Sequence, residues 1–165
     1  MVLKDFDKNL EKYAKLLIST GINVQPGHTV NIVIDVDQAP LARLLVKEAY
    51  AHGASEVIVS WADDFVGRER LLHAAEDRIT NVPEYRVAEM NYLLEKKASR
   101  LNVRSADPDA FAGVSAERLQ KSTKALSLAL KPLRTATQAN KVSWTVAAAA
   151  GKEWAKKVFP NAATD

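Results

Sequence analysis

Cysteine is absent from this sequence of 165 residues, histidine occurs only three times, and no long apolar run is present. Without cysteine the chain has no disulfide framework, no thiolate zinc site and no catalytic thiol. A membrane-spanning helix needs about 18 consecutive apolar residues, so the sequence predicts no membrane partner. The Gly-x-Gly-x-x-Gly, Walker, Gly-x-Ser-x-Gly and His-Glu-x-x-His motifs are missing too, which removes the best-marked nucleotide, hydrolase and zinc-protease signatures.

The beginning of the chain alternates charged and apolar side chains over residues 1–7. A signal peptide has a continuous apolar stretch instead, so the sequence predicts a cytoplasmic protein. The length suits one domain of common size, which is about 100–150 residues. With 47% apolar residues, such a chain can bury a full core without disulfides or metals.

Basic residues are concentrated in the last third of the chain. Residues 1–114 hold 14 Lys and Arg against 17 Asp and Glu, whereas residues 115–165 hold 9 against 3. Basic segments of this kind can bind nucleic acid, but the aromatic residues here do not interleave with the basic ones as a stacking platform requires. We therefore expect no nucleic-acid partner, and a segment that faces either an acidic partner surface or solvent.

Helical and strand patterns alternate along the chain. Alternation of this kind predicts an α/β fold, with a mainly parallel sheet of four or more strands and helices on both faces in three α/β/α layers. The expected strands are residues 29–34, 57–61, 101–104 and 142–146. The expected helices are residues 5–20, a segment from Asp37 to Gly53, about ten residues from Phe65, a helix opened by residues 81–83, a long helix capped by Ser115, and residues 153–159.

The long helix after Ser115 bears leucines at a helical spacing, Leu119, Leu126, Leu130 and Leu133. This spacing places them along one side of the helix. Pro132 falls near the expected end of that helix, where proline commonly stops one.

Carboxylates follow the first two expected strands. Asp35 and Asp37 come after the first strand, and Asp63 and Asp64 after the second. Ligands of open α/β sheets bind outside the carboxyl ends of the strands, and hard divalent cations prefer oxygen ligands. Trp61 precedes the second pair and is the aromatic residue that we expect to form a pocket wall if one exists there.

A second interpretation of the first pair is phosphoryl transfer. Asp35-Val36-Asp37 resembles the aspartate-x-aspartate motif of haloacid-dehalogenase-type phosphatases, in which the first Asp is the nucleophile. The next residues are Gln38 and Ala39 instead of Gly-Thr, and the further Ser/Thr and Lys motifs have no room before Asp63. Carboxylates after strands also serve as helix caps, and Asp37 is the obvious candidate. A Mg²⁺-dependent phosphotransferase using Asp35 and Asp37 is the alternative hypothesis.

The chain as a whole resembles the N-terminal region of the thermophilic-aminopeptidase family of metallopeptidases. Each matching stretch is short, and the resemblance rests on their order and completeness along all 165 residues. The stretches are residues 9–17, 21–27, 46–50, 81–85, 131–134, 141–146 and 153–160.

The resemblance implies a two-domain, homodimeric aminopeptidase that removes N-terminal residues from peptides with two divalent metal ions, zinc or cobalt. In the family the metal ligands and the catalytic Glu belong to the C-terminal domain, and none of those motifs matches a position in this chain. The three histidines (His28, His52 and His73) do not have the spacing of a metal triad either. We therefore expect no catalytic residue and no metal ligand in this chain, which alone should be inactive.

The resemblance also implies a division of the protein. Residues 1–160 form one α/β domain, and residues 161–165 begin a linker to a C-terminal metal domain, which is the expected partner together with peptide substrate. The expected role of the domain is to cover and gate the active site and to support assembly. Trp61, Asp63 and Asp64 are the candidate substrate-pocket residues. A non-enzymatic interaction module is the remaining alternative.

Overall fold

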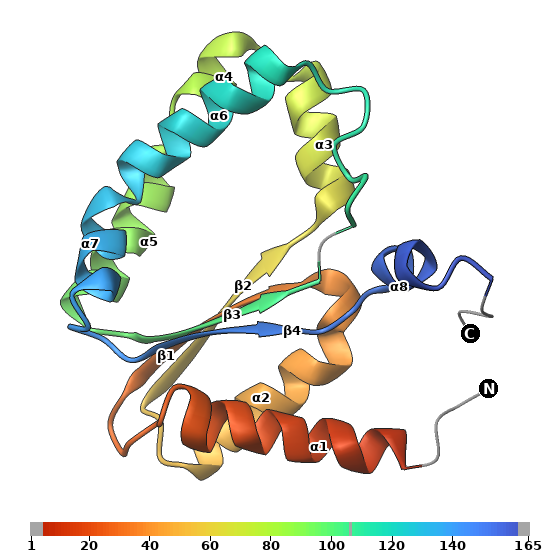
Figure 1. Ribbon diagram of the computed structural model, residues 1–165. Helices are drawn as coiled ribbons and strands as arrows, with labels where there is room; N and C mark the ends of the chain where they lie inside the picture. The colour runs from red at the N-terminus through yellow and green to blue at the C-terminus, as the bar shows by residue number, and fades with distance from the viewer. Residues whose placement is uncertain (1–4, 106, 162–165) are drawn as a thin grey trace.

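The computed structural model describes residues 5–105 and 107–161 and places four parallel strands in one sheet between helices (Figure 1). The strands are β1 (Thr29–Asp35), β2 (Glu56–Ala62), β3 (Ser99–Arg104) and β4 (Trp144–Ala148). Their order in the sheet is β2-β1-β3-β4, and every neighbouring pair is parallel. The predicted fold class, a mainly parallel sheet in a three-layer α/β/α arrangement, is confirmed.

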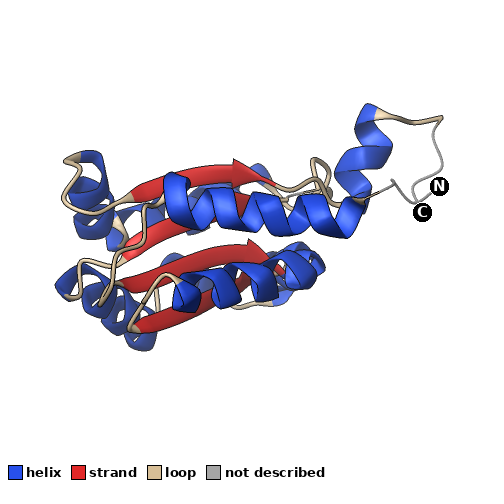
Figure 2. Cartoon of the chain, turned by 90° about the horizontal axis from the view of Figure 1, so that it is seen from below, coloured by secondary structure: helices blue, strands red, loops and turns tan. Residues whose placement is uncertain are grey.

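Helices cover the two faces of the sheet unequally (Figures 1 and 2). One face carries α1 and α2, and the other carries the longer run from α3 to α7, while α8 lies beside the carboxyl ends of the strands (Figure 1). The bounds are α1 (Phe6–Leu16), its π-helical continuation η1 (Leu17–Gly21), the 3₁₀ turn η2 (Val36–Gln38), α2 (Ala39–Ala51), α3 (Asp64–His73), α4 (Glu76–Thr80), α5 (Glu84–Glu95), α6 (Ala116–Ala129), α7 (Lys131–Gln138) and α8 (Lys152–Val158).

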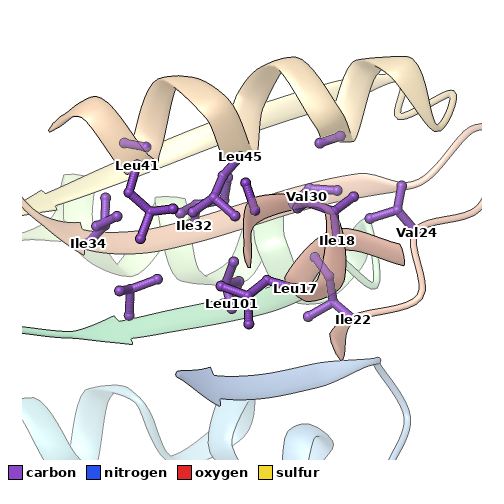
Figure 3. Packing of buried hydrophobic residues seen from close by; sticks show 14 of the residues in the cluster. Leu17, Ile18, Ile22, Val24, Val30, Ile32, Ile34, Leu41, Leu45 and Leu101 are labelled. Atoms are coloured by element: carbon purple, nitrogen blue, oxygen red, sulfur yellow. The ribbon is translucent and has the colours of Figure 1, made fainter. Parts of the chain in front are cut away.

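The main core lies between β1 and the layer formed by α1 and α2 (Figure 3). Alternate residues of β1, Val30, Ile32 and Ile34, are fully buried there. β1 is an inner strand with a partner on each side, so its β-branched side chains are packed from all directions. Leu41 and Leu45 of α2 close over them. This layer matches the apolar stripe that a covered parallel strand requires.

The opposite face of the sheet carries polar side chains. Asn31 of β1 is buried, and its Nδ2 donates a hydrogen bond of 2.9 Å to Ser60 Oγ on β2. Ser60 Oγ donates in turn to Glu89 Oε1 of α5 at 3.4 Å. A small apolar cluster, built on Leu93 of α5 and Leu133 of α7, attaches the second helical layer to this face. The two faces therefore differ, one being apolar throughout and the other mixed.

An arginine joins the helices α3 and α6 of the second layer, which stand as an arch above the sheet in Figure 1. Arg118 Nε donates to Leu71 O at 2.7 Å, and its Nη2 donates to Ala74 O. These carbonyls belong to the last turn of α3, where a cation also complements the helix dipole. Lys121 of α6 pairs with Glu76 of α4. Polar contacts thus hold the arch together.

Several sequence predictions of element bounds were wrong. The fourth strand lies two residues later than expected, from Trp144 to Ala148, because these are the residues whose main chain pairs with β3. This pairing includes an alanine run of low strand propensity. The short helix α4 was not predicted. Pro132 lies in the first turn of the separate helix α7 instead of ending the previous helix, since the first turn of a helix tolerates proline. Residues 162–165 of the expected linker lie outside the described residues.

No helix in the described part of the chain has both the length and the apolarity needed to cross a bilayer.

We predict that Ile32→Ala lowers the free energy of unfolding by about 2–5 kcal/mol, because it leaves a cavity in a core with no route for solvent. The exposed strand residue Val146 provides the control, since Val146→Ala removes little buried surface. Urea titration followed by circular dichroism measures both. Equal losses in the two variants would contradict the assignment of the main core to the α1–α2 face.

Arg118→Leu should destabilise the arch by about 1–3 kcal/mol, because two carbonyls at the end of α3 lose a charged donor. Relative to the parent, hydrogen exchange of the variant should become faster in α3 and α6 but not in α2. The exposed Arg86 of α5 supplies the matched control, Arg86→Leu. Unchanged exchange in α3 and α6 would show that the guanidinium does not hold these helices together.

Candidate functional site

A hollow of about 310 Å³ lies at the carboxyl ends of the strands, where the sequence predicted a site. Parallel strands bring the segments that follow them to the same edge, so residues far apart in the chain meet there. Asp64 and Asp107 illustrate this, since Asp107 N donates to Asp64 Oδ2 at 3.1 Å across 43 residues of chain. The hollow is lined by Asp35, Val36, Asp37, Asp63, Asp64, Phe65, Ser105, Asp107, Gly151, Lys152 and Glu153.

Four carboxylates in the hollow each accept a backbone hydrogen bond, and one of them is Asp107, whose Oδ1 accepts from Asp109 N at 2.9 Å. Asp63 Oδ1 accepts from Val66 N at 3.0 Å and caps α3, and Asp64 accepts from Asp107 as described. Asp35 Oδ1 accepts from Asp37 N at 3.0 Å. Asp35, and not Asp37, is therefore the capping side chain, and the prediction of Asp37 as cap was wrong. Asp37 follows the point where the backbone leaves the strand, so its own N–H is the group that needs an acceptor.

Electrostatic repulsion in the hollow acts on Asp35. Burial raises the pKa of this carboxyl, and the charges of Asp37, Asp64 and Asp63 raise it further. The hydrogen bond from Asp37 N opposes these effects without cancelling them. The protonated form of Asp35 is thus favoured relative to a carboxyl in water.

Close approach of α8 completes the hollow. A Cβ at Gly151 would lie 3.0 Å from Ser105 Oγ and 3.2 Å from Ser105 O, so a larger residue would require Ser105 to shift by a few tenths of an ångström. Ser105 Oγ also accepts a hydrogen bond of 3.1 Å from Gln38 Nε2. The start of α8, with Lys152 and Glu153, is thereby fixed against the strand ends.

The donor set of the described residues does not fit a two-metal centre. No group of three or more His, Cys, Asp or Glu side chains in residues 5–105 and 107–161 is arranged to hold a metal ion. Four carboxylates of the hollow, Asp35, Asp63, Asp64 and Asp107, accept backbone donors, and the histidines are dispersed. His28 Nδ1 lies 3.2 Å from Ser99 Oγ, His52 Nδ1 lies 2.8 Å from Glu48 O, and His73 lies beside Glu69.

Of the candidate pocket residues, Asp63 and Asp64 line the hollow, and Trp61 is not among its lining residues. Trp61 alternates with Val57 and Val59 of β2, which face the main core, so its ring lies on the α2 side of the sheet, with 49% of the residue exposed. Phe65, in the first turn of α3, is the aromatic side chain at the hollow. Sequence reasoning missed it, although its position directly after Asp63 and Asp64 was a usable signal.

Comparison with known proteins gives one consistent group. A family model described as thermophilic metalloprotease (M29) matches residues 6–165. Aminopeptidase PepS of Streptococcus thermophilus is 70% identical over 165 residues, which cover 100% of this chain and 40% of that protein. Aminopeptidase AmpS of Bacillus subtilis (strain 168) is 36% identical over 158 residues, covering 96% of this chain and 38% of that protein.

The structural comparison agrees. The solved structure of wild-type AmpT from Thermus thermophilus superimposes with a TM-score of 0.88 at 33% sequence identity, covering 96% of this chain and 40% of that one. The chain thus spans about 40% of the length of the relatives it matches. On its sequence over nearly the whole length, and on its fold, the chain belongs to the M29 family of thermophilic metalloproteases.

Proposed function

We propose that this chain is the N-terminal domain of a metallo-aminopeptidase, which removes N-terminal amino acids from peptides. The observation that carries the proposal is the family match over residues 6–165, with a chain that covers about 40% of relatives named aminopeptidases. This match favours peptide hydrolysis over the alternatives of a phosphotransferase based on Asp35 and Asp37 or a non-enzymatic interaction module.

The metal chemistry belongs, in this proposal, to the part of the longer protein that the chain does not cover. Two divalent ions, zinc or cobalt, would activate a water molecule and polarise the scissile carbonyl there. The donor set of the described residues supports this division, because Asp35 and Asp63 serve as caps and the histidines are dispersed over the domain. This chain then contributes no catalytic residue and no metal ligand.

The proposed role of this domain is to cover the metal domain and to wall the substrate cavity. The hollow at the carboxyl edge is the surface that would face the peptide, with Asp63 and Asp64 in its lining and Trp61 at the same end of β2. A wall of this kind excludes water and bulky chains from the reacting groups. A cytoplasmic homodimer, whose contacts this domain supports, completes the proposal.

The division of labour predicts an activity difference between two proteins. The 165-residue chain should release no product from aminoacyl chromogenic substrates when Zn²⁺ or Co²⁺ is added. An extended chain, in which this domain is followed by the remaining 60% or so of the Streptococcus thermophilus relative, should release product and lose that activity with a chelator. Turnover by the short chain near the rate of the extended chain would contradict the proposal.

The raised pKa of Asp35 predicts a pH-dependent stability. The folded state binds the proton more tightly than the unfolded state, so Asp35 favours folding at low pH, and this contribution is lost as pH rises through the raised pKa. Asp35→Asn keeps an acceptor for Asp37 N and removes the repulsion. We expect stabilisation at pH 7 of about 0.5 kcal/mol or less, because Asp35 is only partly buried and solvent screens its charge.

The gain from Asp35→Asn should shrink as the pH is lowered through the range in which Asp35 takes up its proton. Thermal unfolding between pH 3 and pH 8 measures it. Glu11→Gln, at an exposed position of α1, removes a charge far from the hollow and serves as control. A variant less stable than the parent at pH 7, or a gain that grows toward low pH, would contradict a pKa of Asp35 raised by burial and by the neighbouring carboxylates.

A further inference from the structure

The leucines of the helix after Ser115 are buried at one end only. Leu133 of α7 is buried and Leu130 packs against the same cluster, which also contains Leu93 and Ile58. Leu119 and Leu126 of α6 remain 37% and 44% exposed, and no residue of α6 is buried. Because Leu130 has a helical backbone, the helical period carries from α6 into α7. Leu119 and Leu126 therefore lie on the same side of the helix as Leu130, which packs against this cluster.

The sheet below this helix is also uncovered at its edge. Trp144 and Val146 of β4 are 46% and 58% exposed. Thr145, between them, donates its hydroxyl hydrogen to Gly21 O on the α1 side, so its two neighbours point to the opposite face. That is the face on which α6 and α7 lie (Figure 1). Two apolar rows, one on a helix and one on a strand, thus flank the same side of the sheet.

A basic side chain lies next to the β4 row, on the same face of the sheet. Arg100 of β3 is the register partner of Trp144 and shares its face, since Leu101 beside it enters the main core. Its Nε is buried and has no hydrogen-bond partner within residues 5–105 and 107–161. Burial lowers the pKa of this guanidinium. A partly buried cation without a carboxylate is costly, and an acidic group brought by a partner would remove that cost.

The charged groups around these rows are of both signs. A hollow of about 920 Å³ runs along α6, and its lining includes Leu119 together with Glu117 and Lys124. Lys121 of α6 is paired with Glu76 and Glu117. The buried Nε of Arg100 has no such partner among the described residues. This guanidinium favours an apolar partner surface that carries a carboxylate.

We propose that Leu119 and Leu126 of α6, with Arg100, Trp144 and Val146 of the sheet, form the docking surface for the remainder of the aminopeptidase chain. This surface is called the α6–β4 surface below. The inference rests on the proposed function, because it takes the partner from the length of the relatives, of which this chain covers about 40%. The partner surface is apolar and places at least one carboxylate next to Arg100. Exposed apolar rows of this kind mark interaction sites.

Hydrogen exchange of the short and extended chains tests the location without relying on activity. In the extended chain, amides of α6 and β4 should exchange at about one tenth of their rate in the short chain or below it, because docking adds to their local stability. Amides at the exposed side of α1 should be unchanged. Protection that appears only outside α6 and β4, or none at all, overturns the inference even if the extended chain is an active peptidase.

Variants of the extended chain separate docking from folding. Leu126→Glu and Val146→Glu should restore fast exchange in both α6 and β4, whereas Leu16→Glu, at a residue of α1 that is 55% exposed, should not. Circular dichroism of the short chains checks that each variant folds. Exchange in α6 and β4 that stays slow in both variants overturns the inference. So does slowing of these amides with concentration in the short chain alone, because a second copy would then occupy the surface.

Discussion

Burial of one side of β1 against α1 and α2 is the interaction on which the rest of the structure depends. Ile32 and its neighbours Val30 and Ile34 are fully buried, and β1 holds β2 on one side and β3 on the other. Because the strands are parallel, fixing β1 also fixes where their carboxyl ends meet. The position of the acidic hollow is therefore set by the core. Its carboxylates are then held in place by hydrogen bonds from backbone N–H groups. Burial of the apolar core contributes enough free energy of folding to offset the repulsion between these carboxylates.

The second helical layer is held by fewer apolar contacts and more polar contacts than the main core. Its attachment to the sheet is a small apolar cluster, and the arch relies on Arg118 and on the pair between Lys121 and Glu76. Exposed ion pairs contribute little, and hydrogen bonds to charged groups contribute modestly. The α3–α6 region should therefore be the part of the domain that opens most easily. A face that is weakly attached and partly uncovered is suited to packing against another part of a larger protein.

The order and type of most elements could be predicted from the sequence, because strands such as residues 29–34 have β-branched runs and the main helices have clear apolar periods. Short elements could not, since α4 contains only five residues and provides no full period. The candidate site was partly predictable. Strand ends locate Asp63 and Asp64 at the hollow, but strand order is set by tertiary packing. Alternation along β2 places Trp61 on the same face as Val57 and Val59. Which face of the sheet that is became clear only from the packing of these two valines against the main core.

The polarity of the second sheet face connects the fold with the proposed division of the protein. A self-sufficient three-layer domain covers both faces of its sheet with apolar side chains, whereas this one places Asn31, Arg100 and Asn102 on the second face. Asn31 is satisfied within the domain by Ser60, but the Nε of Arg100 is not. Arg100 lies on β3, with Asn31 of β1 on one side of it and Trp144 of the edge strand β4 on the other. A partner that packs on the exposed Trp144 and Val146 would therefore reach this guanidinium from the open edge of the sheet.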